Sequence, residues 1–67
     1  MGFETKVIRA VAEVIERDRC ANFYNGTMFV DCDASEAAEI ETFLLENVVN
    51  CGIVVSKVDR EFAFDFV

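Results

Sequence analysis

The sequence predicts an α+β fold: a two-layer sandwich in which a mainly antiparallel four-stranded sheet carries two helices on one face. Three observations predict it. An apolar stripe at helical spacing lies near the N-terminus, an Asn-Gly pair separates two β-forming stretches, and phenylalanine alternates with other residues at the C-terminus. The chain has 67 residues, which is enough for one domain. We therefore expect a single small acidic domain over residues 1–67, with elements in the order αββαββ.

Residues 4–18 are predicted to form the first helix. Their apolar residues fall on one stripe at helical spacing, with charged residues opposite. The stripe consists of Val7, Ile8, Val11, Val14 and Ile15. Glu13 and Arg17 are four residues apart, in the favourable order for an ion pair. This pattern indicates a helix with one face on a core and the other in water.

Residues 21–31 are predicted to form a β-hairpin. Asn25-Gly26 suits a type I′ turn, which needs positive φ at both central residues. A two-residue turn here places Tyr24 opposite Thr27 and collects the apolar residues on one face. That face consists of Ala21, Phe23, Met28, Val30 and Cys32.

A second helix is predicted from a capping box, with Asp33 as N-cap and Glu36 at the third helical position, to about Asn50. Gly52 is interpreted as its C-terminal stop. Its apolar residues occupy two neighbouring stripes, and Phe43 lies off both among acids. The stripes are Ala37, Ile40, Leu44 and Val48, and Ala38, Leu45 and Val49.

Residues 53–58 and 61–67 are predicted to be two strands joined at Asp59-Arg60. Phe62, Phe64 and Phe66 alternate onto one face, and a two-residue turn places them opposite Lys57, Val55 and Ile53. Asp-Arg is poor turn chemistry, so a register shift of one or two residues stays open. Parallel pairing between the two hairpins also stays open.

The charge of the chain is concentrated after residue 20. Up to there, four acids are balanced by four bases, whereas nine acids then face only Lys57 and Arg60, which gives the net charge of −7. Residues 31–46 contain six acids and no base. Such a field selects basic partners and opposes direct binding to nucleic acid or to anionic membranes. With no apolar run suited to a signal peptide or a membrane span, we expect a soluble, cytoplasmic protein.

The residues needed for catalysis are scarce. The chain has no histidine, and its cysteines (Cys20, Cys32 and Cys51) are widely spaced, so we interpret them as buried free thiols. A metal or thiol site would require the three sulfurs to converge. Asp31 and Asp33 could hold Mg²⁺, but capping by Asp33 and solvent exposure of Asp31 explain the pair more simply. We predict no cofactor, no metal and no enzymatic activity.

The leading hypothesis is a non-enzymatic module that docks on the basic surface of a partner protein, such as a nucleic-acid-binding enzyme, as an inhibitor or decoy. Small viral proteins that disable host enzymes often have this composition, although no motif is shared. The candidate partner-binding residues are Asp31, Glu36, Glu39, Phe43 and Glu46. Phe43 would be the desolvated anchor. Alternatively, it packs at the core edge and leaves Leu45 and Val49 exposed.

A homo-oligomer is the alternative function, most simply a two-fold dimer. It would assemble through the outer sheet face or through the second apolar stripe of the second helix. The apolar residues expected on the outer face are Tyr24, Phe29, Val54, Val58 and Val67.

Overall fold

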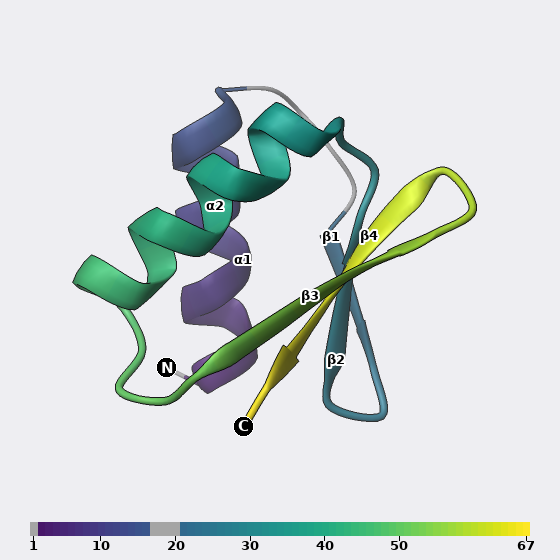
Figure 1. The fold of residues 1–67 in the computed structure, drawn as a ribbon. Coiled ribbons are helices and arrows are strands. Elements are labelled where there is room, and N and C mark those ends of the chain that lie inside the picture. The colour runs from purple at the N-terminus through teal and green to yellow at the C-terminus, as the bar shows by residue number, and fades with distance from the viewer. Residues whose placement is uncertain (1, 17–20) are drawn as a thin grey trace.

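The computed structural model describes residues 2–16 and 21–67, and the predicted α+β fold is confirmed (Figure 1). The elements are α1 (Phe3–Ile15), β1 (Ala21–Tyr24), β2 (Thr27–Val30), α2 (Ala34–Asn47), β3 (Ile53–Val58) and β4 (Glu61–Phe66). Both helices lie on the same side of the four-stranded sheet (Figure 1). The molecule therefore has one helical layer and one sheet layer.

The strand order is β1-β2-β4-β3, and every pairing between these strands is antiparallel. Both predicted hairpin registers are confirmed: Tyr24 pairs with Thr27, and Ile53 pairs with Phe66 without a shift. The two hairpins join through β2 and β4, so the parallel arrangement does not occur between them. This order leaves β1 and β3 at the two edges of the sheet.

The two hairpin turns reach the same connection by different chemistry. Asn25 and Gly26 have φ values of 51° and 82°, as a type I′ turn requires. In the second turn Asp59 has φ of 55°. Aspartate is among the few residues with a side chain that tolerate this left-handed region, which explains why a weak turn signal still holds the predicted register.

The core lies between the helices and the inner sheet face. Its largest fully buried side chains are Val7, Val11, Met28, Val30, Ile40, Leu44 and Phe64. α1 packs against α2 and β1, and α2 packs against β3. Each helix therefore covers the edge strand of its own half of the chain.

Both helices end earlier than predicted. α1 ends at Ile15, where Glu16 adopts a left-handed conformation with φ of 50° and donates its N–H to the Ala12 carbonyl at 3.0 Å. Arg17 and Asp18, the last two residues of the predicted helix, lie outside the described residues, and so does the expected Glu13–Arg17 pair. α1 also begins one residue earlier than predicted, at Phe3.

The predicted role of Gly52 is wrong. α2 ends at Asn47, and the N–H groups of Val48 and Val49 both donate to the Leu44 carbonyl, at 3.0 and 2.9 Å. The early end lets Val49 turn into the core, where it is buried. Gly52 instead exchanges two backbone hydrogen bonds of 3.0 Å with Val67, which extends the β3–β4 ladder by one pair.

In the described part of the chain, no helix combines the length and the apolar character that crossing a bilayer requires.

Candidate functional site

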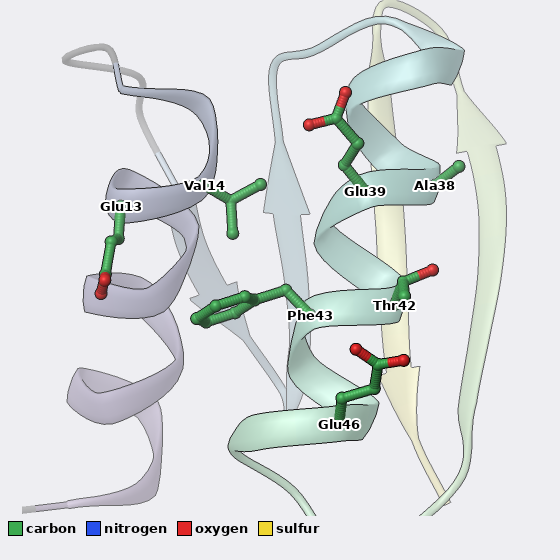
Figure 2. Close-up of a pocket in the computed structure, with 7 residues that line it drawn as sticks. All are labelled: Glu13, Val14, Ala38, Glu39, Thr42, Phe43 and Glu46. Atoms are coloured by element: carbon green, nitrogen blue, oxygen red, sulfur yellow. The ribbon is translucent and has the colours of Figure 1, made fainter.

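An open groove of about 600 Å³ lies along α2 on the side away from the sheet and extends to α1 (Figure 2). Glu39, Phe43 and Glu46 line it from α2, at positions i, i+4 and i+7 of one helix face. The remaining lining residues are Glu13 and Val14 of α1, with Ala38 and Thr42 of α2. Three of the five predicted partner-binding residues are therefore brought together here.

Phe43 forms the apolar centre of this groove. Its ring extends from α2 toward α1 on the side where Val14 lies (Figure 2), and it packs half-buried against the core. The sequence left two positions open for Phe43, an exposed anchor or a place at the core edge, and in the structure it packs at the core edge. Leu45 is then exposed, at 44%, but Val49 is buried, contrary to what that alternative expected. Phe43 still presents part of its ring to the groove.

Acidic side chains surround this ring. Glu39 and Glu46 are exposed and lie about one turn on either side of Phe43, and the exposed Glu13 adds a third carboxylate from α1. The described lining residues include no lysine or arginine. The groove therefore combines an apolar surface with a rim of negative charge, which suits the aliphatic stem and cationic head of a lysine or arginine.

The molecule already contains one contact of this kind. The Nζ atom of Lys57 lies 4.8 Å from the centre of the Phe62 ring, across the β3–β4 pair. A cation over an aromatic face is attracted by the ring quadrupole. Phe43 offers a similar ring to a cation from outside, with carboxylates beside it.

Glu36 and Asp31 do not line the groove. Glu36 completes the predicted capping box: its N–H donates to Asp33 Oδ1 at 2.8 Å, and its Oε1 accepts from the Asp33 N–H at 3.1 Å. Asp31 is exposed between β2 and α2. Among the described residues, no group of three or more cysteine, aspartate or glutamate side chains is placed to hold a metal ion.

Sequence reasoning missed four of the lining residues: Glu13, Val14, Ala38 and Thr42. Glu13 and Val14 were assigned to α1 alone, as a solvent-exposed acid and a core residue. Helical periodicity placed Glu13 on the solvent face and Val14 on the core stripe, but the position of both residues beside α2 depends on how the helices pack. No local pattern in the sequence encodes that packing.

Two of the three cysteines lie in the described part of the chain. Cys32 is buried and Cys51 is half-buried. Cys20 lies outside the described residues. The predicted burial is therefore confirmed for Cys32 alone.

The outer sheet face carries the apolar residues that were expected there, and neither α1 nor α2 covers it (Figure 1). Tyr24 is 70% exposed, Val54, Val58 and Val67 are exposed as well, and Phe29 is half-buried. Two acids of β4 share this face. Asp65 accepts a hydrogen bond from the Thr27 hydroxyl. Glu61 lies four residues before Asp65 on the same strand and therefore faces the same way. Two copies stacked through it would bring carboxylates together.

Comparison of the chain with protein-family models, with curated proteins and with solved structures finds no match in any of the three.

Proposed function

We propose that this protein is a non-enzymatic binding module that receives basic side chains of a partner protein in the α1–α2 groove. The observation that carries the proposal is the half-buried Phe43 ring, with Glu39 and Glu46 beside it and Glu13 on the neighbouring helix. A module of this kind inhibits its partner when the basic surface that it covers also binds nucleic acid.

The groove suits binding better than catalysis. It is open to solvent, whereas general acid or base chemistry gains most of its strength in a site that excludes water. Its carboxylates belong to the exposed residues Glu13, Glu39 and Glu46, which steer a basic partner toward the groove. Phe43 supplies the apolar contact that distinguishes docking from diffuse attraction.

The charge of the whole chain supports the same partner class. The net charge of −7 repels phosphates and anionic surfaces and accelerates association with basic proteins. Because this steering is electrostatic, we expect the association rate to fall as salt is added, while contacts at Phe43 mainly set the dissociation rate.

The test is a fluorescence-anisotropy titration with a labelled amphipathic helical peptide that carries lysine and arginine on one face and leucine on the other. A scrambled peptide of the same composition is the control for nonspecific charge. We expect Glu39→Lys to weaken binding by about tenfold, and the matched charge reversal Glu4→Lys, at an exposed site outside the groove, to weaken it far less.

Phe43→Leu measures the contribution of the aromatic ring to binding separately from that of the glutamates. Leucine keeps much of the apolar contact with the core edge and retains high helix propensity. We expect this variant to stay folded and to bind about tenfold more weakly. Equal affinity for the ordered and scrambled peptides, or equal effects of Glu39→Lys and Glu4→Lys, would contradict a groove-specific function.

A further inference from the structure

β3 is an edge strand whose outward hydrogen-bonding groups can be assigned from the β3–β4 ladder. Gly52 and Val67 exchange both of their backbone hydrogen bonds, at 3.0 Å each. In an antiparallel ladder such pairs alternate, so Val54, Ser56 and Val58 are the residues bonded to β4. The N–H and C=O groups of the three residues between them, Ile53, Val55 and Lys57, therefore point away from β4, along the open edge.

This edge has few of the features with which proteins protect open strands. β3 is six residues long, contains no proline, and has Lys57 as its one charged residue. The Lys57 ammonium lies over the Phe62 ring, back across its own sheet, rather than over the open edge. By contrast, the other edge strand, β1, is only four residues long.

Exposed apolar side chains accompany the edge on both faces of the sheet. Val54 and Val58 are 52% and 41% exposed on the outer face. On the helical side, Ala38 points away from α1 (Figure 2), and the exposed Leu45 lies two turns further along the same flank of α2. Because α2 is the helix that packs on β3, this flank and the open edge lie on the same side of the molecule.

We propose that the β3 edge pairs with the β3 edge of a second copy of this chain, in antiparallel orientation, so that the two sheets become one continuous sheet. Pairing centred on Val55 places Val55 of the two copies opposite each other and places Ile53 opposite Lys57 of the second copy. In this register the outward groups of all three residues find partners. The contact is two-fold and self-complementary, as in most homodimers.

Charge is the reason for assigning a second copy to this edge rather than to another surface. Each copy carries a net charge of −7, so self-association is least opposed where acids are fewest. β3 contains no acid, whereas the outer sheet face carries Asp65 and the α1–α2 groove is lined by three glutamates. A basic partner, in turn, finds Lys57 and no carboxylate on this strand, and is better placed in the groove.

The first test is amide hydrogen exchange by NMR on the full chain over a concentration range up to about 1 mM, together with light scattering. We expect a dimer to form as concentration rises and the Ile53, Val55 and Lys57 amides to gain protection. The amides of Ala21 and Phe23, on the β1 edge, are the internal control and should not change. Dimerisation should strengthen with added salt, because screening reduces the repulsion between acidic copies.

A single backbone methyl group provides the matched variant. Residues 51–67 can be joined as a synthetic peptide to residues 1–50 through Cys51, with Val55 or Ser56 N-methylated. Methylation of Val55 removes an outward N–H and should weaken dimerisation at least about tenfold while the monomer stays folded. Methylation of Ser56 removes a bond to β4 and should lower the stability of the monomer instead.

Three outcomes overturn the proposal. The first is a monomer at every concentration and salt. The second is a dimer in which the Val55 amide stays unprotected, which places the contact on another face. The third is protection of Val55 that requires an added foreign peptide. The groove-binding function is independent of all three, because it weakens with salt, whereas the edge dimer strengthens.

Discussion

The two halves of the chain, α1–β1–β2 and α2–β3–β4, have the same architecture but leave different surfaces uncovered. Each helix packs on the edge strand of its own half, and the halves meet where β2 pairs with β4 (Figure 1). α1 directs its apolar residues to one side, where Val7, Ala10 and Val11 are buried. α2 buries a comparable stripe, yet it also presents Phe43 to the groove and Leu45 to solvent.

Even the exposed aromatic residue of α1 is used within the fold. Phe3 is partly exposed, but its ring packs edge-on against two aromatic rings of the sheet. The ring centroids are 5.3 Å apart for Phe3 and Phe66 and 6.4 Å apart for Phe3 and Phe23. These contacts tie the start of α1 to the sheet. The comparison teaches that apolar residues beyond the needs of one core are concentrated in the second half, which contains the β3 edge and contributes Phe43 to the α1–α2 groove.

The largest contrast is expected between two adjacent residues of α2. Leu44 is fully buried and Leu45 is 44% exposed. Leu44→Ala should destabilise the fold by about 2–5 kcal/mol, because it removes core contacts and leaves a cavity. Leu45→Ala should change stability by less than about 0.5 kcal/mol. Urea unfolding followed by circular dichroism measures both. Similar losses would mean that α2 is rotated about its axis relative to the structure.

If Leu44→Ala is unfolded without denaturant, Ile40→Val provides a graded version of the same measurement. Ile40 is also fully buried, and removal of one methyl group typically costs about 0.5–1.5 kcal/mol.

The next contrast is between the glycines of the two hairpins. Gly26 has φ of 82°, a conformation that is unfavourable for residues with a side chain, so Gly26→Ala should cost about 1–2 kcal/mol. Gly52→Ala places a Cβ atom 3.2 Å from Val67 Cγ2. Val67 is exposed and can shift, so we expect a smaller loss. Thermal unfolding of the two variants measures the difference. A larger loss of stability for Gly52→Ala would mean that the contact with Val67 costs more than the positive φ at Gly26.

The two helices also differ at their N-termini, because α2 has a side-chain cap and α1 has none. In α2 the Asp33 side chain accepts the Glu36 N–H at 2.8 Å, so Asp33→Ala should cost about 1 kcal/mol. Urea unfolding with Ser35→Ala as the control, at an exposed position in the first turn, isolates the cap. Equal losses for the two variants would show that the capping bond contributes little.

The smallest expected effect is a gain. α1 begins after Gly2, which makes no side-chain capping bond. Gly2→Ser supplies a hydroxyl that can accept a backbone N–H of the first turn, and it should stabilise the fold by a few tenths of a kcal/mol. Gly2→Ala, which adds a Cβ atom in open space but no acceptor, is the matched control. A gain only for serine would assign the effect to capping.

Local patterns predicted much of the fold because the interactions behind them are close in sequence. The Asn25-Gly26 turn and the alternation of Phe62, Phe64 and Phe66 were sufficient for both hairpin registers. The capping box was sufficient for the start of α2. The ends of the helices were not predictable in this way, because Val49 enters the core only once α2 is placed against the sheet.

The candidate site was predicted in part. Periodicity placed Glu39, Phe43 and Glu46 on one face of α2, and they do line a common groove. Glu36 is instead engaged in its capping box, and Asp31 lies elsewhere. The contribution of Glu13 and Val14 could not be predicted, because it depends on which side of α1 faces α2.

The sequence by itself determined the elements, the hairpin registers, the capping box and the acidic character, since each depends on residues a few positions apart. Tertiary structure decided that β2 and β4 join the hairpins, which makes β1 and β3 the edges. It also set the rotation of α2 that half-buries Phe43 and leaves Leu45 exposed. These features arise from contacts between segments distant in sequence. Their free energy depends on how whole faces pack together, which no local pattern specifies.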